Sequence, residues 1–224
     1  MSSERLIDLT HPIRQDMPVL PGDPQPAVDH LLSLETDACA VQRLTFNNHL
    51  GTHLDAPAHF IPGGATIDQL PLETLVGEAR LVDFSDKGAG DIIRREELAE
   101  RLPASGFPQR LLLRTGWDQH FHSAEYFRGF PVLSLAAAEL LAEQGLTLLG
   151  LDTPSPSPLD DPGQGIHLAL LGAGTVILES AKGLTRIPHP SCRLIVLPLS
   201  LFGCSGSPCR AVAVVEAEPT IPEP

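Results

Sequence analysis

Aromatic and basic side chains are both scarce in this chain. Phe, Trp and Tyr together make up 4% of its 224 residues. Lys and Arg number 15 against 28 Asp and Glu, which gives a formal net charge of −13 at pH 7. Nucleic acids and anionic membrane surfaces attract basic proteins, so we expect neither as a partner. Beyond that, the acidic balance predicts only a soluble protein.

Cysteines and long apolar runs are also few. The four cysteines form no CxxC pair, and their low density predicts free thiols in a reducing compartment. No apolar run is long enough to cross a bilayer. The first residues show no basic segment followed by an apolar core, which is the pattern of a signal peptide. We therefore expect a cytoplasmic protein.

Proline and glycine are abundant and evenly spread. The 22 prolines and 19 glycines do not gather in one linker, which indicates many turns within one compact domain. With 42% hydrophobic residues, that domain can bury a substantial core. We predict one domain over residues 1–217, followed by a flexible tail rich in Pro and Glu at residues 218–224.

Short apolar runs alternate with helical patterns along the chain. Several runs are continuous rather than alternating, as expected for strands buried on both faces. The predicted strands are 6–9, 41–46, 79–84, 111–114, 146–151, 176–178, 194–199 and 211–215. The predicted helices are 94–102, 134–144 and 166–171, the second of them capped by Ser134 and ended by Gly145. The fold class is mixed α/β.

The densest group of chemically active side chains lies within residues 49–59. Its three histidines and one aspartate all occupy odd positions, namely His49, His53, Asp55 and His59. Side chains alternate along an extended backbone, so we expect these four on one face and the apolar residues between them on the other. Two imidazoles with a carboxylate suit zinc or manganese. The spacing predicts a divalent-metal site.

A helix is the alternative backbone for this stretch, because it would also bring His49 near His53. Gly51 and Pro57 both oppose a helix. On an extended backbone Gly51 also leaves space between the two imidazoles. We therefore predict an extended run.

His167 and Glu179 are the best distant candidates to complete the site. Glu179 ends a short apolar run, and a carboxylate at the end of a buried strand needs a partner. His167 opens an apolar segment, so each residue alone is compatible with an ordinary place in the core. Together with the first cluster they suit two metals bridged by Asp55 and Glu179, with His59 left over. Such paired ions activate water.

The chain resembles the cyclase-like metal-dependent hydrolases, whose best-known members are the bacterial kynurenine formamidases. The resemblance depends first on the signature His49-x-Gly51-Thr52-His53-x-Asp55-Ala56-Pro57-x-His59. Further matching blocks are residues 8–13, 21–23, 151–155 and 207–212. The resemblance therefore extends over nearly the whole chain.

This resemblance implies a single domain of the swivelling β/β/α type with a mixed central sheet, and a homodimer or a higher homo-oligomer. It also implies two divalent ions, with Zn²⁺ favoured and Mn²⁺ as the alternative. The implied ligands are His49 and His53 on one ion, His167 on the other, and Asp55 and Glu179 shared between them. His59 takes the position of the family's general acid and base.

The activity implied is hydrolysis of N-formyl-L-kynurenine to L-kynurenine and formate, a step of tryptophan degradation. His59 would accept a proton from the attacking water and deliver one to the departing aniline nitrogen. An imidazole suits both steps because its pKa lies near the working pH.

Leu20 is a departure from the kynurenine formamidase pattern, in which an aromatic residue commonly precedes Pro-Gly-Asp and contacts the aryl substrate. An aromatic pair contributes about 1 kcal/mol beyond the area it buries. We expect Leu20 to contact the substrate without that stacking. Trp117 and Phe121 are candidates to line the pocket instead, or to pack a loop onto the core.

Two other functions remain open on sequence alone. A ring-opening hydrolase of a cyclic amide or lactone, similar to isatin hydrolase, would use the same metal signature. A non-catalytic metal-binding domain is the third hypothesis. His59 argues against it, because this imidazole exceeds the number of ligands needed.

Overall fold

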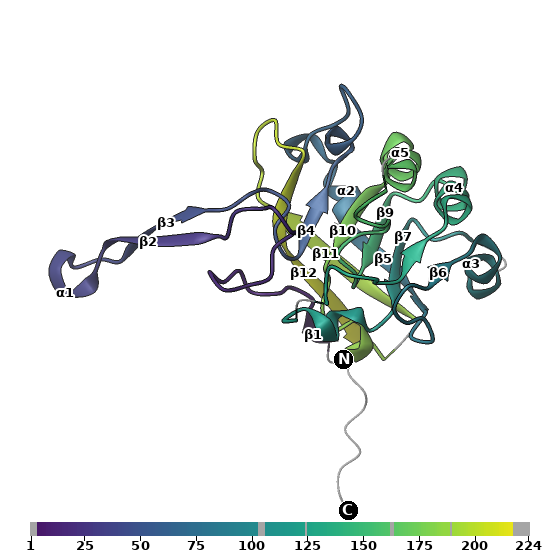
Figure 1. Cartoon of the computed structure of the whole chain (residues 1–224), viewed down its shortest axis with the longest axis horizontal. Coiled ribbons are helices and arrows are strands. Elements are labelled where there is room, and N and C mark those ends of the chain that lie inside the picture. Colours follow the sequence, from purple (N-terminus) through teal and green to yellow (C-terminus); the bar gives the residue numbers. More distant parts are fainter. Residues whose placement is uncertain (1–3, 103–105, 124, 162–163, 189, 217–224) are drawn as a thin grey trace, which may run out of the picture.

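One eight-stranded sheet organises the molecule (Figure 1). The computed structural model describes residues 4–102, 106–123, 125–161, 164–188 and 190–216. The strands follow the order β1-β12-β11-β5-β7-β9-β10-β4, and β4 also pairs with β12, so the sheet closes on itself. The strands are β1 Glu4–Asp8, β4 His53–Asp55, β5 Val76–Asp83, β7 Arg110–Arg114, β9 Leu148–Leu151, β10 Val176–Glu179, β11 Ser191–Pro198 and β12 Gly206–Glu216.

The sheet is mixed, as predicted. Strands β5, β7, β9 and β10 run parallel to their neighbours in that series, whereas the pairings of β1, β4, β11 and β12 are antiparallel. In β9, Leu148 packs into the interior of the closed sheet. Leu149 and Leu151 of the same strand pack in a second core, beneath the helices. Burial on both faces explains why the parallel strands have continuous apolar sequences.

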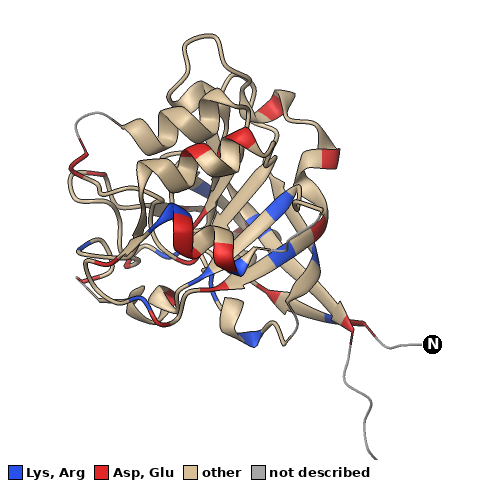
Figure 2. Cartoon of the chain, turned by 90° about the vertical axis from the view of Figure 1, so that its right-hand side faces the viewer, with Lys and Arg blue, Asp and Glu red and all other residues tan. Residues whose placement is uncertain are grey.

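Three helices cover the outer face of the parallel strands, and all three were predicted (Figure 1). They are α3 Arg95–Arg101, α4 Leu135–Glu143 and α5 Gly165–Gly172. Helix α4 begins after Ser134, whose hydroxyl accepts a hydrogen bond from the Ala137 amide at 3.2 Å. Figure 2 shows acidic side chains dispersed over this helical side of the molecule.

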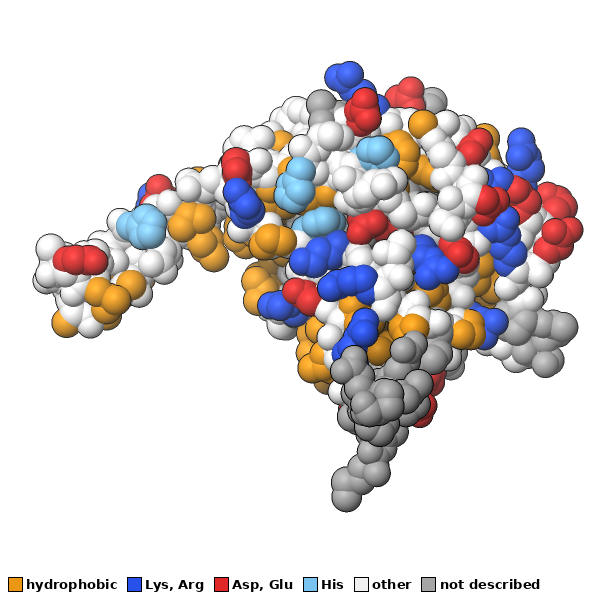
Figure 3. All heavy atoms as spheres, turned by 90° about the horizontal axis from the view of Figure 1, so that it is seen from below, with side chains coloured by type: hydrophobic (Ala, Val, Ile, Leu, Met, Phe, Trp, Pro, Cys, Tyr) orange, Lys and Arg blue, Asp and Glu red, His pale blue; other side chains and the backbone are white. Residues whose placement is uncertain are grey.

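A two-stranded arm, residues 27–45, projects from the body (Figure 1). It comprises β2 Ala27–Leu32, α1 Leu34–Asp37 and β3 Val41–Thr45. The predicted strand at 41–46 therefore exists, but it lies in this arm rather than in the core. Figure 3 shows hydrophobic side chains on the arm, and its exposed large apolar residues are Leu31, Leu32, Leu34, Val41 and Leu44.

The remaining elements are short. They are β6 Ile92–Ile93 and β8 Val132–Leu133, which pair with each other, helix α2 Leu72–Leu75, and the 3₁₀ turns η1 Pro57–His59, η2 Ile67–Gln69, η3 Trp117–His120 and η4 Leu184–Arg186. None of the helices within the described ranges has the length and apolar character to span a bilayer. The mixed α/β class is confirmed, whereas the predicted tail at 218–224 lies outside the described residues.

Candidate metal centre and active site

Strand β4 places the first candidate ligands at the seam where the sheet closes. His53 of β4 is paired with Glu179 of β10, and Asp55 is paired with Ile177 on that side and Gly206 on the other. Paired residues of antiparallel strands point to the same face with their Cβ atoms about 5 Å apart. The register itself therefore brings the imidazole of His53 beside the carboxylate of Glu179.

The stretch 49–59 is not one extended run, so that part of the sequence prediction was wrong. Only His53–Asp55 forms a strand. Gly51 has φ +59°, and a Cβ there would lie 2.8 Å from the Met17 side chain. Pro57 then opens the 3₁₀ turn η1. Gly51 is thus needed for a turn and a close approach, not to leave space between imidazoles.

The side chains of this stretch nevertheless converge. His49 Nδ1 lies 2.7 Å from Asp55 Oδ1, and His53 Nε2 lies 3.3 Å from the same oxygen. The His59 ring stacks on the His49 ring with 3.9 Å between centroids. The turn at Gly51 and the η1 turn bring His49 and His59 back over β4, which a straight strand would not do.

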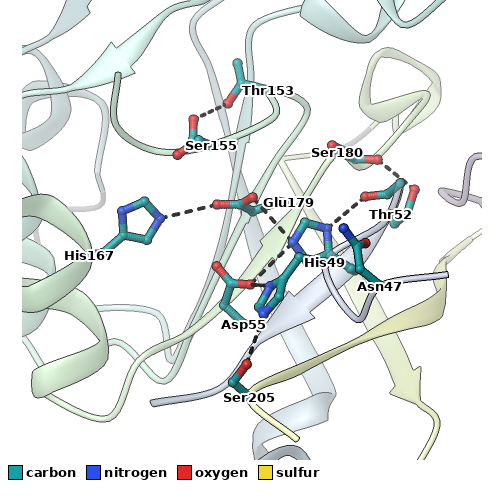
Figure 4. Close-up of polar contacts among 12 residues, drawn as sticks. Asn47, His49, Thr52, Asp55, Thr153, Ser155, His167, Glu179, Ser180 and Ser205 are labelled. Atoms are coloured by element: carbon teal, nitrogen blue, oxygen red, sulfur yellow. Dashed lines mark hydrogen bonds and ion pairs between the residues drawn. The ribbon is translucent and has the colours of Figure 1, made fainter. Parts of the chain in front are cut away.

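Both distant candidates join this cluster (Figure 4). Glu179 Oε2 lies 3.5 Å from His53 Nε2, and Glu179 Oε1 lies 3.5 Å from His167 Nε2. Figure 4 shows Glu179 between His167 of α5 and the imidazoles near Asp55. His53, Asp55, His167 and Glu179 are all buried, whereas His49 and His59 are partly exposed. The structure thus brings together all six residues predicted for the metal centre and its acid–base group.

The carboxylates and imidazoles of the cluster shift one another's pKa values. Burial raises the pKa of Glu179 well above its usual range, and the charge of Asp55 raises it further. Burial also disfavours the Asp55 carboxylate, but its hydrogen bonds with His49 and His53 outweigh that effect and hold its pKa below the usual range. Burial lowers the pKa of His53, yet Asp55 and Glu179 together raise it to about 9.

These residues fit a divalent metal. Glu179 Oε1 is buried and makes no hydrogen bond within the described part of the chain. Such an acceptor is costly unless a cation or a donor meets it. Ligand atoms of His49, Asp55 and His59 lie within 4.8 Å of one another, as do those of His53, Asp55 and Glu179. Two groups that share Asp55 and contain only imidazoles and carboxylates suit zinc, manganese or cobalt.

Several residues that orient the ligands escaped the sequence analysis. The Ser205 hydroxyl lies 3.1 Å from His49 Nε2, and the Ser157 hydroxyl lies 3.1 Å from His167 Nδ1. The Gly51 carbonyl accepts a hydrogen bond from His53 Nδ1 at 2.9 Å. Such second partners fix the orientation of a ligating imidazole. Of these residues, only Ser157 could have been suggested by the sequence, because it lies close to His167 and to the 151–155 block.

A cavity of about 380 Å³ opens onto the cluster. This volume lies within the range of small-molecule sites. Leu20 lines the cavity as predicted, and aromatic contact comes from Phe60, Phe121 and Phe127. Trp117 is instead buried in the core beneath the cavity, where its Nε1 donates a hydrogen bond to the Tyr126 carbonyl at 2.9 Å. Phe121 therefore lines the pocket, and Trp117 packs its loop.

Comparison with known proteins agrees with this geometry. Residues 7–158, more than half of the chain, match the model of the Cyclase family. The chain belongs to the Cyclase family. The resemblance inferred from the 49–59 signature is thereby confirmed.

Relatives of this Cyclase member include hydrolases. A kynurenine formamidase from Bacillus mycoides (strain KBAB4) is 36% identical over 213 residues, which are 95% of this chain and 98% of the relative. Isatin hydrolase A from Labrenzia aggregata, solved with benzyl benzoate, is 26% identical with a TM-score of 0.84, covering 96% of this chain and 94% of that one. A predicted metal-dependent hydrolase from Bacillus stearothermophilus is 27% identical with a TM-score of 0.80, covering 95% and 99%.

Proposed function

We propose that this Cyclase member is a metal-dependent amidohydrolase that converts N-formyl-L-kynurenine to L-kynurenine and formate. The observation that carries the proposal is the buried cluster of imidazoles and two carboxylates that opens into a cavity of about 380 Å³. The kynurenine formamidase at 36% identity over 95% of this chain supports the choice of substrate. An enzyme is favoured over a binding domain because the relatives compared are hydrolases.

We assign the metal ligands as the family resemblance implies. His49 and His53 would hold one ion and His167 the other, with Asp55 and Glu179 available to both. The three imidazoles and two carboxylates gathered here support two ions rather than one, and nitrogen and carboxylate donors favour Zn²⁺. Bound there, the ions supply Lewis acidity and make water acidic enough to attack at neutral pH.

His59 is placed to move protons at the open side of the cluster. Burial lowers its pKa to about 4, and the neighbouring imidazoles add to that shift while Asp55 opposes it. A neutral imidazole accepts a proton from water and returns it to the aniline nitrogen as the amide breaks. His59 lines the cavity together with Phe60, which packs against its ring at 4.4 Å between centroids.

A metal-removal assay tests this function. The purified protein is stripped with a chelator, its metal content is measured, and N-formyl-L-kynurenine hydrolysis is followed before and after addition of Zn²⁺ or Mn²⁺. We expect activity to disappear with the metal and to return with one of the two. Full activity in protein shown to be free of metal would reject the proposal.

Ring opening of a cyclic amide is the second candidate, and the similarity to isatin hydrolase A favours it. The same metals and cavity would accept isatin. Hydrolysis rates on N-formyl-L-kynurenine, isatin and simple lactones separate the two candidates. We expect the highest kcat/KM on the linear formamide. A higher value on isatin would replace the first candidate with the second.

We also propose that the protein is a homodimer, in keeping with the sequence resemblance. The arm supports this assignment, because Leu34 and Leu44 are 68% and 60% exposed there. Exposed apolar patches mark association surfaces. Light scattering after gel filtration should give a dimer for the natural protein and a monomer for Leu44→Asp. Asp29→Asn, on the neighbouring strand of the arm, is the control and should remain dimeric. A monomeric natural protein would reject the assignment.

A further inference from the structure

Among its described lining residues, the cavity has one carboxylate outside the metal cluster and no Lys or Arg. This acidic group is Asp23, which neither the ligands nor His59 explain. Asp23 makes no ion pair within the described ranges of the chain. The wall at Asp23 therefore offers negative charge without a counter-ion.

Asp23 is held in place from two sides. Its backbone amide donates to the Leu20 carbonyl at 2.9 Å, closing a turn in which Gly22 has φ +102°. Asn47 Nδ2 donates to Asp23 Oδ2 at 2.6 Å. The same turn contains Leu20, which we expect to contact the aryl ring. Leu20 and the Asp23 carboxylate are therefore held in one turn.

Asn47 adds a second acceptor at the same place. Its Oδ1 is buried and has no hydrogen-bond partner among the described residues. One N–H of its Nδ2 is directed to Asp23, so Asn47 Oδ1 and the Asp23 carboxylate are the acceptors that these two cavity-lining side chains offer. A buried acceptor without a partner is costly, and a donor from a bound molecule removes that cost.

We propose that Asp23 and Asn47 form the subsite for the α-ammonium group of an amino-acid substrate. The inference depends on the proposed amidohydrolase function, which it deepens by naming how the substrate is selected. Asn47 precedes the ligand His49 by two residues, so their Cα atoms are at most about 7 Å apart. In N-formyl-L-kynurenine the amide and the ammonium group are separated by a short aryl ketone. Asp23, Asn47 and the cluster line the same cavity, so a molecule with its amide at the cluster can extend towards Asp23.

The subsite also explains selection between the two candidate substrates. Isatin has no amine and would leave Asp23 and Asn47 Oδ1 without a donor. No Lys or Arg is present among the described lining residues to pair with the α-carboxylate of kynurenine. Charge recognition is therefore directed to the amine, and Asp23 is a specificity-determining residue.

The test compares two formamides in Asp23→Asn. One is N-formyl-L-kynurenine, and the other is 2′-formamidoacetophenone, which has the same aryl ketone and no amine. A hydrogen bond to a charged group contributes enough for about a 10- to 100-fold effect. We expect KM for N-formyl-L-kynurenine to rise by that factor with kcat little changed, and both constants for 2′-formamidoacetophenone to stay the same. Asp16→Asn is the control, because Asp16 pairs with Arg14 on the surface and lies outside the cavity lining.

Equal losses on both formamides would show a structural role for Asp23, and no change on either would show no role. Both results overturn the inference. Asn47→Ala is the second variant and should raise the same KM if Asp23→Asn does not fold.

Calorimetric binding of L-kynurenine and of 2-aminoacetophenone separates this inference from the proposed function. If the natural protein hydrolyses neither formamide, the proposed function fails. A preference for L-kynurenine that Asp23→Asn abolishes would still support the subsite, and equal binding of the two ketones would overturn it.

Discussion

At the scale of single residues, Asp55 connects the parts of the cluster. It lies 2.7 Å from His49 and 3.3 Å from His53. Its charge raises the pKa of Glu179 and opposes the lowering of the pKa of His59 and His167. One buried carboxylate therefore influences every other group at the site. Replacement of Asp55 should therefore affect the whole cluster, unlike replacement of a partly exposed imidazole.

Substitution of His59 tests the division between ligands and acid–base group. We expect His59→Gln to retain its metal and to lose turnover by about 10²- to 10⁴-fold, the usual contribution of a general acid or base. His53→Ala should lose metal and turnover together. Kinetics combined with elemental analysis of both variants provides the measurement. Metal loss in His59→Gln would instead make His59 a ligand, alongside His49 and Asp55.

His11 makes the stability of the folded protein depend on pH. It is 6% exposed, and its ring stacks on Phe121 with 3.5 Å between centroids. Burial lowers its pKa to about 3, and the charges of Lys182 and His122 add to the shift. The unfolded chain binds the proton near pH 6.5 and the folded chain does not. The stability contributed by the neutral ring is therefore complete above pH 6.5 and is lost as the pH falls towards 3.

His11→Phe keeps a stacked ring without the titration. We expect the free energy of unfolding of the natural protein to fall by up to about 1.4 kcal/mol more per pH unit below pH 6.5 than that of the variant. Urea unfolding at pH 7 and pH 5 measures this difference. An identical fall in both proteins would contradict the assignment to His11.

The residues of the cluster were predictable from sequence, but the hydrogen bonds that support them were not. Spacing within one short stretch gave His49, His53 and Asp55, and positions beside apolar runs gave His167 and Glu179. Ser205 lies more than 150 residues from the His49 that it contacts. That contact depends on how the sheet closes, which no local pattern records.

At the scale of elements, strand β12 contributes to the site through Gly206, which has no side chain. A Cβ on Gly206 would lie 2.5 Å from His49 Cε1 and 2.7 Å from the Leu54 carbonyl oxygen. Both contacts are closer than real side chains allow, so the His49 ring can occupy its place only beside glycine.

Gly206→Ala should therefore displace His49. We expect metal affinity to fall by about 10- to 100-fold, as when the support of a ligand is removed, with a parallel loss of activity. Metal titration measures this. Gly88→Ala is the matched control, because its Cβ would meet nothing closer than Asp91 Oδ2 at 4.0 Å. Unchanged affinity in Gly206→Ala would contradict the role given to β12.

Long elements were easier to predict than short ones. The helix at Leu135–Glu143 has a cap and an apolar pattern that act locally, and it forms as predicted. Strand β4 has only three residues and is defined by its partners β10 and β12. Gly51 and Pro57 correctly argued against a helix, yet the turns that they cause replaced the expected extended run.

At the scale of the whole molecule, metal binding and stability are coupled. An ion that binds only the folded state stabilises it by about 4 kcal/mol when its free concentration is a thousand times Kd. For a chain of this size that corresponds to roughly 10 °C in Tm. We expect calorimetry to show such a fall after chelation, and no fall in Asp55→Asn. An unchanged Tm in natural protein proven to have lost its metal would contradict this coupling.

The pairing of β4 with strands on both sides distinguishes the cluster residues from the residues that line the rest of the cavity. The ligands of β4 and β10 are fixed by hydrogen bonds to strands on both sides, whereas Leu20 and Asp23 belong to a turn outside the sheet. We expect mutations in that turn to change which molecules bind and to leave the cluster in place. Substrate preference could then diverge through the loops of this scaffold while the paired strands are retained.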